Sequence, residues 1–405
     1  MIRILHLSDF HYKPTHPEDF EDMGKKIATD VLKRLDNNSL DLIVFSGDLV
    51  YAGNKKETFE KAATALFDPI KKLTGLTNEQ ILLAPGNHDR TFGKELPIVK
   101  TGINSCSTQE DLDKFCSAKE QLALSIVDQE EYNAYINEFY SDDWIKKELY
   151  TCRKITCNGH QIGLLSLNSS WRCSGESRND RGKLVFPVYA VKEAFKHLRD
   201  TEFIFCTEHH NLSDYCEYIA RDIEDELHDK CHILFTGHYH KTSINVNHDS
   251  EVGMIHISAP ASFNRNDNEV NFGYSIIEFD EDEEKAIVTP YLYTSKQFCE
   301  TRAVWVNIPV SQEKIKQNTF RKLIRKRYQE TLAIADDLFV NHGVGMFLKM
   351  FNNPIIKDKS VQEIITSQRE GQKYQLADIA YQNKSAIIFG YGKRGKTSLL
   401  MRISS

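Results

Sequence analysis

Residues 2–11 read IRILHLSDFH, and this stretch decides the fold. Residues 3–8 have the length and apolar character of a buried strand, and the polar Asp9 and His11 follow its end. The next residues, 19–35, repeat apolar side chains with the spacing of an amphipathic helix. The amino terminus therefore predicts a strand followed by a helix, with polar side chains where the strand ends.

The same arrangement recurs further along the chain. The apolar run 41–46 leads into Asp48, and after a helical pattern at 55–73 the run 80–84 leads to Asn87. This order predicts a βαβαβ unit with parallel strands. Open α/β sheets place their sites at the carboxyl ends of such strands, which is where these polar residues fall.

Strand signals resume after an acidic helical stretch at about 107–147, which we expect to be an insertion. Eight further strands are predicted, at 154–156, 161–167, 202–207, 231–236, 244–246, 254–258, 274–279 and 286–290. Two sheets stacked face to face between helices accommodate them all.

Length and charge indicate more than one domain. At about 100 to 200 residues per domain, 405 residues predict two to three domains. Residues 301–405 carry 18 Lys and Arg against 8 Asp and Glu, which leaves a net charge of −17 for the first 300 residues. We expect a first domain at 1–300, a basic helical linker region at 301–381, and the start of another domain at 382–405. The acidic body disfavours indiscriminate binding of polyanions.

Cysteine usage and hydropathy favour the cytoplasm. The nine cysteines are odd in number and irregularly spaced, as expected of reduced thiols. We find no run of about 18 uncharged apolar residues, and the amino terminus becomes polar too early for a secretory leader. We therefore predict a cytoplasmic protein with no membrane partner.

Five short polar segments each follow a strand-like apolar run. They are Asp9-Phe10-His11, Gly47-Asp48, Gly86-Asn87-His88-Asp89, His209-His210 and Gly237-His238-Tyr239-His240. Any one of them occurs by chance in many proteins. Five in this order favour a shared site over a set of unrelated polar turns.

In these segments residues 1–295 resemble the calcineurin-like metallophosphoesterases. The resemblance implies an α/β fold, the four-layer α/β/β/α sandwich of that family, here with a helical C-terminal extension. It also implies two divalent metal ions, with Mn²⁺ the first expectation and Fe, Zn²⁺, Ni²⁺ or Mg²⁺ as alternatives. Oxygen and nitrogen ligands of this kind suit such ions, and a pair about 3.5 to 4 Å apart needs a bridging carboxylate.

The resemblance assigns roles residue by residue. Asp48 would bridge the two ions, and the remaining metal ligands would be Asp9, His11 and His240 for the first ion and Asn87, His209 and His238 for the second. His88 would be the catalytic residue that binds no metal and protonates the leaving oxygen, with Asp89 fixing its orientation.

Candidate substrate contacts lie near these motifs. Guanidinium groups match phosphate geometry, and the second histidine of the His209-His210 pair lies near substrate in relatives. We predict substrate contacts from Arg90, Arg172, Arg178, Arg181 and His210. Trp171 is a candidate stacking surface, and Asn211 departs from the proline that is common in the family.

The last 24 residues contain a phosphate-binding motif. A strand-like run at 385–389 precedes GYGKRGKT at 390–397, which fits the P-loop pattern through Gly390, Gly395, Lys396 and Thr397. Only eight residues follow Thr397, so we expect ATP and Mg²⁺ to bind only in a longer protein. The layout resembles NACHT/STAND ATPases, several of which act in antiviral defence, and implies self-association through that module.

Several functions remain open. A nuclease acting on DNA or RNA is the first hypothesis. The alternatives are a phosphodiesterase for cyclic nucleotides or other small molecules, a phosphomonoesterase or protein phosphatase, and a scaffold or sensor without turnover. Metal content together with hydrolysis of a generic diester separates the enzymes from the scaffold.

Overall fold

The computed structural model describes residues 1–174, 180–249, 252–263, 272–281, 283, 285–307, 356–357 and 373–374. The chain divides into two compact units, Met1–Lys314 and Ile315–Ser405. The second unit contains a described antiparallel pair of short strands, β15 (Ile356–Lys357) and β16 (Lys373–Tyr374). The predicted P-loop and most of the predicted basic linker lie outside the described residues.

The first sheet of unit Met1–Lys314 joins the two ends of its chain. The strand order is β13-β12-β11-β1-β2-β3, with β14 also pairing with β12. β1, β2 and β3 are parallel, as the βαβαβ pattern predicts, and β11 pairs antiparallel with β1. The strands are β1 (Ile2–Leu7), β2 (Leu42–Ser46), β3 (Ile81–Ala84), β11 (Gly273–Asp280), β12 (Lys285–Thr294), β13 (Gln297–Glu300) and β14 (Val304–Asn307).

The second sheet has the order β4-β5-β6-β7-β8-β10-β9. Its central strands β6, β7, β8 and β10 are parallel, and the outer pairs are antiparallel. The strands are β4 (Ile145–Lys146), β5 (Tyr150–Cys157), β6 (His160–Leu167), β7 (Phe203–Thr207), β8 (Ile233–Thr236), β9 (Ser243–Asp249) and β10 (Val252–Ser258).

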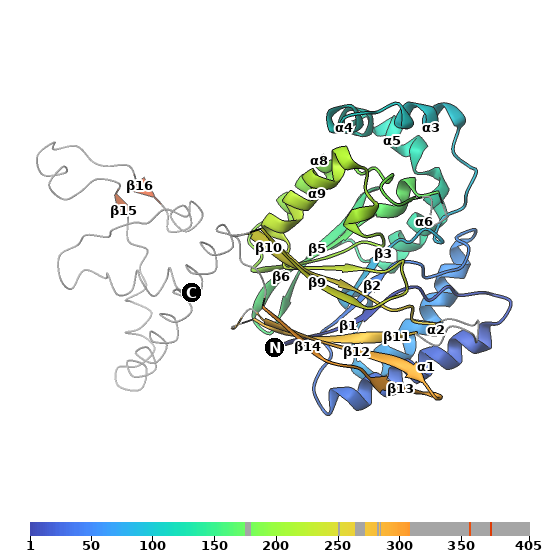
Figure 1. The fold of residues 1–405 in the computed structure, drawn as a ribbon, viewed down its shortest axis with the longest axis vertical. Coiled ribbons are helices and arrows are strands. Elements are labelled where there is room, and N and C mark those ends of the chain that lie inside the picture. Colours follow the sequence, from blue (N-terminus) through green and yellow to red (C-terminus); the bar gives the residue numbers. More distant parts are fainter. Residues whose placement is uncertain are drawn as a thin grey trace, which may run out of the picture. The chain divides into compact units, whose positions relative to one another are not determined.

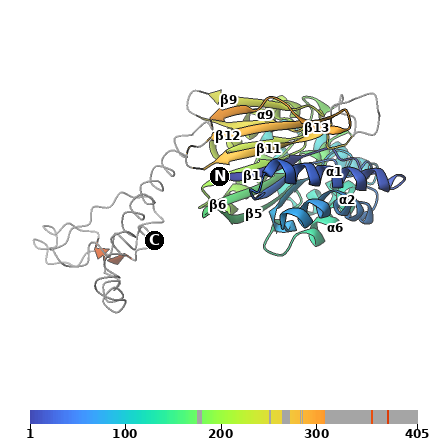
Figure 2. The same ribbon diagram turned by 90° about the horizontal axis from the view of Figure 1, so that it is seen from below.

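Helices cover the outer faces of both sheets, so the unit has four layers, α/β/β/α (Figures 1 and 2). The first sheet is covered by α1 (Pro17–Leu35) and α2 (Lys56–Thr74), and the second by α8 (Val188–His197) and α9 (Glu217–Lys230). This confirms the predicted fold class. In the described part of the chain, no helix is both long and apolar enough to span a bilayer.

The helical insertion begins earlier than the sequence analysis predicted. It contains α3 (Pro97–Asn104), α4 (Gln109–Ser117), α5 (Lys119–Ser125) and α6 (Glu130–Phe139). Pro97 occupies the first turn of α3, a position where its missing N–H costs nothing. The last predicted residues are not helical, because Ile145–Lys146 pairs with β5 as an edge strand.

Short 3₁₀ helices shape the connections between these elements. They are η1 (Asn78–Gln80), η2 (Val127–Gln129), η3 (Ser169–Arg172) and η4 (Leu212–Asp214). Of these, η3 follows β6 and η4 follows β7, so both lie at carboxyl ends of strands in the second sheet.

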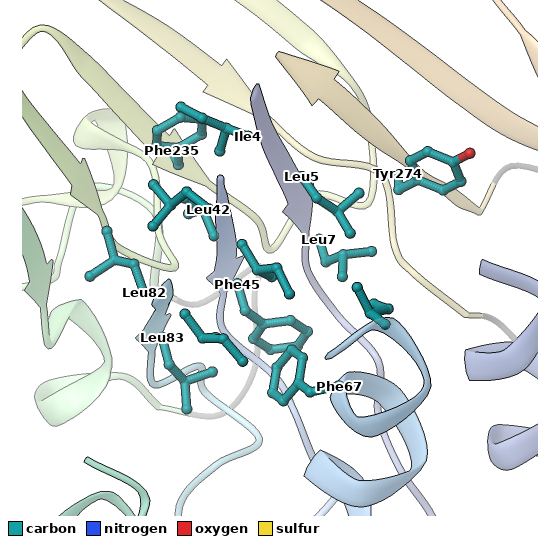
Figure 3. Close-up of a cluster of buried hydrophobic side chains, with 14 of the residues drawn as sticks. Ile4, Leu5, Leu7, Leu42, Phe45, Phe67, Leu82, Leu83, Phe235 and Tyr274 are labelled. Carbon is teal, nitrogen blue, oxygen red and sulfur yellow. The ribbon is translucent and has the colours of Figure 1, made fainter. Parts of the chain in front are cut away.

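A large apolar core separates the two sheets and continues under α1 and α2. In Figure 3, Leu42 of β2 lies near Phe235 of β8, whereas Phe45 lies near Phe67 of α2. The Phe45 and Phe67 rings meet edge to face, with centroids 5.6 Å apart. Burial of each such side chain contributes about 1.5 to 3 kcal/mol. Because β2 is buried on both faces, its sequence is a continuous apolar run without polar alternation.

Candidate metal centre

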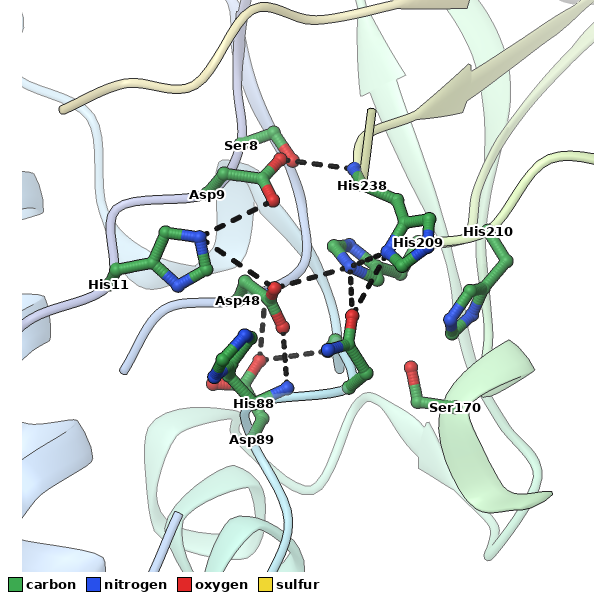
Figure 4. A network of polar contacts seen from close by, with 12 residues as sticks. Ser8, Asp9, His11, Asp48, His88, Asp89, Ser170, His209, His210 and His238 are labelled. Carbon is green, nitrogen blue, oxygen red and sulfur yellow. Dashed lines mark hydrogen bonds and ion pairs between the residues drawn. The ribbon is translucent and has the colours of Figure 1, made fainter. Parts of the chain in front are cut away.

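Seven polar side chains converge where the strands of the two sheets end, and Figure 4 labels five of them, Asp9, His11, Asp48, His209 and His238. They follow β1, β2 and β3 in the first sheet and β7 and β8 in the second. Strands in the two sheets pack against each other, since β2 and β3 both contact β7. The site is therefore assembled from five segments that lie up to 231 residues apart in the chain, from Asp9 to His240.

One group of side chains lies at the opening of the site, and we call Asp9, His11 and His240 the rim cluster. Asp9 Oδ1 lies 3.1 Å from His240 Nε2 and 3.7 Å from His11 Nε2. The two ring nitrogens, His11 Nε2 and His240 Nε2, are 3.4 Å apart. The side chain of His240 is 42% exposed and that of His11 17%, whereas Asp9 is fully buried, so the rim cluster reaches solvent through its histidines.

The other group is enclosed, and we call Asn87, His209 and His238 the inner cluster. Asn87 Oδ1 lies 3.0 Å from both His209 Nε2 and His238 Nδ1. These two ring nitrogens are 3.2 Å apart. His209 Nδ1 lies 2.7 Å from the Ser46 carbonyl oxygen, so it carries the proton and donates it, which leaves Nε2 as a ligand atom. All three cluster residues are buried.

Asp48 lies between the two clusters and contacts both. Its Oδ2 is 3.3 Å from His209 Nε2 and 3.8 Å from His11 Nε2, and its Oδ1 accepts a hydrogen bond from the His88 backbone N–H at 2.8 Å. A Cβ on Gly86 would lie 2.0 Å from Asp48 Oδ1, so only glycine fits there. The position of Asp48 is that of a bridging ligand.

The backbone at this site is strained. Five of the seven residues that make up the two clusters and Asp48 have a positive φ, a region that non-glycine residues rarely adopt. The angles are 54° at Asp9, 51° at His11, 60° at Asp48, 70° at His238 and 53° at His240. Each costs of order 1 to 3 kcal/mol, and such strain concentrates where side chains must converge for function.

The residues of the site are suitable ligands for divalent ions, because of their chemical type and because a buried ligand atom lacks a hydrogen-bond partner. Carboxylate, amide and imidazole groups are suitable ligands for Mn²⁺, Fe and Zn²⁺. His238 Nε2 is buried and has no hydrogen-bond partner in the described structure. In the rim cluster, the ligand atoms of Asp9, His11 and His240 lie within 4.8 Å of one another, and so do those of Asp9, Asp48 and His209.

The protonation of the histidines at this site is set by their burial and by the charges of Asp9 and Asp48. Burial lowers the pKa of His11 and of His238 to about 4, so both rings are neutral at pH 7. Burial also acts to lower the pKa of His209, but the nearby Asp48 and Asp9 carboxylates outweigh it and raise that pKa to about 10. The negative charge of the site therefore favours a cation beside His209, and a metal ion would displace this proton.

His88 stands beside the metal ligands and is held by Tyr51. The imidazole Nδ1 lies 2.9 Å from the Tyr51 carbonyl oxygen, and the two rings stack with centroids 5.3 Å apart. The carbonyl is only an acceptor, so Nδ1 carries a proton and Nε2 is the nitrogen that can exchange protons with a substrate. The His11 ring packs edge-on against His88 at 4.8 Å.

The predicted orientation of His88 by Asp89 is wrong. The Asp89 carboxylate is buried and accepts hydrogen bonds from four backbone N–H groups, those of Asp48, Leu49, Val50 and Gly86. Burial and the Asp48 charge raise the pKa of Asp89 to about 7, and the backbone donors oppose this shift. Asp89 thus fixes the loop that carries Asp48. The sequence analysis missed Tyr51, whose main-chain contact leaves no mark in the residue types.

The predicted arginine contacts separate into interior and exposed residues. Arg90 is buried, with its guanidinium 3.0 Å from Asp128 Oδ2 and hydrogen-bonded to the carbonyls of Ser170 and Cys173. Arg172 forms an ion pair with Glu95. Neither guanidinium can bind a substrate without breaking these bonds, because both are used inside the fold. Arg181 is exposed, and Arg178 lies outside the described residues.

Two other predicted contacts are also interior. Trp171 is fully buried and donates from Nε1 to the Val185 carbonyl, so the prediction of a stacking surface is wrong. His210 is buried beside the inner cluster, with its ring centroid 4.5 Å from that of His238. Asn211 stands where the family commonly has proline. Here it caps η4 together with Asp214, and its backbone N–H, which proline lacks, donates to Asp214 Oδ2.

Comparison with known proteins agrees with this geometry. The family model for calcineurin-like phosphoesterase matches residues 2–242. Among solved structures, a dimetal phosphatase from Danio rerio is similar at 8% identity and a TM-score of 0.42, covering 76% of this chain and 99% of that one. GAP50 of Plasmodium, the anchor in the inner membrane complex, is similar at 12% identity and a TM-score of 0.43, covering 77% of this chain and 90% of that one.

The family match spans more than half of the chain and includes every segment that contributes to the rim and inner clusters. Members of this family use two divalent metal ions, and the two clusters joined by Asp48 provide candidate ligands for such a pair. The chain belongs to the calcineurin-like phosphoesterase family and is a metal-dependent phosphoesterase.

Proposed function

We propose that this chain hydrolyses phosphodiester bonds in nucleic acid. The observation that carries the proposal is the placement of His88, which lies beside both the rim cluster and Asp48 while its Nδ1 is engaged by Tyr51. Hydrolysis of a diester expels an alkoxide from phosphorus. An alkoxide is a poor leaving group and needs a proton in the transition state. His88 Nε2 is placed to supply that proton.

The chemistry divides between the metal ligands and the protein's own acid. When bound, two divalent ions would polarise the phosphoryl oxygens and acidify the attacking water. Asp48 and the two clusters would orient the phosphate, and the buried Asp89 would keep Asp48 in place through the backbone bonds described above. The Tyr51 carbonyl would hold the orientation of the His88 ring by accepting its Nδ1–H.

Exposed groups near the site favour a nucleotide substrate. Tyr239 is 39% exposed, and its ring lies next to His238 of the site. Aromatic rings of this kind bind bases by stacking, at about 1 to 3 kcal/mol per base. Arg181, also exposed, would contribute a phosphate contact. We therefore propose DNA or RNA as the substrate.

A small cyclic or linear dinucleotide is the second candidate. Residues 1–300 carry a net charge of −17, which repels a long polyanion more than a short one. The same His88 chemistry would act on either substrate, so only a direct comparison of lengths separates them.

The P-loop motif supports a proposal about the larger assembly. Residues 390–397 fit the phosphate-binding pattern but lie outside the described residues. We propose that the phosphoesterase is the effector of an ATPase-coupled cytoplasmic protein that self-associates and acts in antiviral defence. ATP-dependent stimulation of nuclease activity in a protein with the complete module would support this role, and activity indifferent to ATP would contradict it.

The test is hydrolysis of linear DNA, single-stranded RNA and a cyclic dinucleotide with added Mn²⁺. His88→Ala should lose about 10²- to 10⁴-fold in kcat while keeping the metal content of the parent. His228→Ala, on the far helix α9, is the matched control and should be unchanged. A substrate with an acidic phenol leaving group should be much less sensitive to His88→Ala, because that group leaves without a proton.

The outcomes are distinct. Cleavage of DNA or RNA that His88→Ala loses would establish the nuclease. Consumption of the cyclic dinucleotide alone would replace it with the second candidate. A metal-loaded protein that cleaves none of the three substrates would refute the proposal.

A further inference from the structure

A third group of ligand-type side chains lies beside the inner cluster. Cys173 follows η3, His210 follows β7, and Asp180 lies between them in sequence. The three residues are 5%, 0% and 3% exposed, respectively. One thiol sulfur, one ring nitrogen and one carboxylate oxygen lie within 4.8 Å of one another. Such a mixture of buried Cys, His and Asp is uncommon in a protein interior unless its members are paired or bind a metal.

Two of these side chains have unmet bonding capacity. Asp180 Oδ1 accepts a hydrogen bond from the Ser174 N–H at 2.7 Å, but the buried Oδ2 has no hydrogen-bond partner in the described structure. His210 Nε2 is also buried without a partner. Each unsatisfied group costs about 1 to 3 kcal/mol, and more when it is charged. A single cation between them would satisfy both.

The neighbouring arginine does not serve as that cation. Arg90 Nη1 lies 3.5 Å from Cys173 Sγ, but it also donates to the carbonyls of Ser170 and Cys173, and Nη2 pairs with Asp128. The Arg90 charge is therefore balanced by Asp128, and its contact with the sulfur fixes the position of the Cys173 side chain.

Ser169 fixes the far side of the His210 ring. Ser169 Oγ lies 3.0 Å from His210 Nδ1 and accepts the backbone N–H groups of His209 and His210, so its O–H is the group directed at Nδ1. The ring proton then stands on Nε2, and an ion bound at Nε2 would move that proton to Nδ1 and turn the hydroxyl hydrogen away.

We propose that Cys173 Sγ, Asp180 Oδ2 and His210 Nε2 bind a third divalent ion, separate from the dinuclear centre. The set of one sulfur, one nitrogen and one oxygen ligand suits Zn²⁺ and leaves one tetrahedral position for water. Ligand atoms around tetrahedral Zn²⁺ lie about 3.5 Å apart, so binding requires only a small contraction of the group. His210 is then a metal ligand and not a substrate contact.

The ion would act as a positioning element for the inner cluster. His210 directly follows His209 in the chain, and its ring packs against that of His238 at a centroid distance of 4.5 Å. Fixing His210 to Cys173 and Asp180 ties the connection after β7 to the one after η3. This inference goes beyond the proposed nuclease activity and does not depend on it.

Cobalt binding tests the proposal, because the two clusters of the dinuclear centre contain no sulfur. The full chain, loaded with Co²⁺ and dialysed, should contain three ions and show a thiolate-to-cobalt charge-transfer band in the near ultraviolet. Cys173→Ser should contain two ions and lose the band. Cys106→Ser removes a partly exposed thiol that takes no part in the group, and this control should match the parent.

A second variant covers the case in which Cys173→Ser does not fold. Asp180→Asn has the same shape and can keep the Ser174 contact through its side-chain oxygen, but it removes the charge. It should fold, as judged by circular dichroism, and bind the third ion at least 10-fold more weakly. Asp48→Asn should lose ions of the dinuclear centre and keep the thiolate band. At most two ions in the parent, or a band that persists in folded Cys173→Ser, would overturn the proposal.

Discussion

The rim cluster and the inner cluster use similar ligands in different surroundings. His240 at the rim is 42% exposed, whereas His209 in the inner cluster is fully buried and fixed by the Ser46 carbonyl. An exposed ligand reorients at little cost, but a buried one is held by the fold. The comparison indicates that the inner cluster is held more rigidly than the histidines of the rim cluster.

Replacing the shared ligand should have the largest effect. Asp48→Asn removes the negative charge that both clusters face, so both ions should bind more than about 100-fold more weakly, since even outer partners of metal ligands are worth about 10- to 100-fold. Metal analysis after dialysis measures the loss. Asp41→Asn, at the residue directly before β2, is the control. Retention of one tightly bound ion would show that the clusters are independent.

Removing one ligand from each cluster sharpens the contrast. His240→Ala should weaken one ion and leave thermal stability unchanged, because the side chain is partly in solvent. His209→Ala should weaken the other ion and also lower the free energy of unfolding by about 1 to 3 kcal/mol, since it leaves buried polar atoms unpaired. Metal titration and denaturation in chelator check the two effects. Equal destabilisation by both substitutions would contradict the division into rim and interior.

Metal affinity should depend on pH through the inner cluster. The metal-free protein holds a proton at His209, whose pKa is raised to about 10, so below that pH an ion must displace the proton. The apparent affinity for the inner ion should fall about 10-fold for each unit of decrease between pH 8 and pH 6. His11 is neutral in this range, so the rim ion should respond less. Competition with a chelator at three pH values tests this, and equal slopes for both ions would contradict it.

The smallest effect should come from the exposed arginine. Arg181→Ala should raise KM about 2- to 5-fold with unchanged kcat and stability, the scale of a solvent-exposed ion pair. Arg199→Ala, which follows α8 away from the motifs, is the matched control. Steady-state kinetics on a diester substrate measures this change in KM. An unchanged KM would show that Arg181 does not contact the substrate.

The order of motifs was enough to predict much of the site. The apolar runs ending at Asp9, Asp48 and Asn87 predicted parallel strands with polar carboxyl ends. The structure brings these residues together with His209, His238 and His240. The helices before and after β2 were also expected from their spacing. The start of the insertion was missed, since Pro97 marks a helix start only when its neighbours fold as a helix.

The sequence by itself determined the strand–helix alternation and the chemical types gathered at the strand ends, because periodicity and residue type are local properties. Tertiary structure alone decided which polar residues remain free of internal partners and can contact a substrate. Arg90 and Arg172 have the same sequence character as Arg181, yet partners distant in the chain, Asp128 and Glu95, neutralise the first two inside the fold. Pairing across the chain depends on where the backbone places two groups, and no local pattern encodes it.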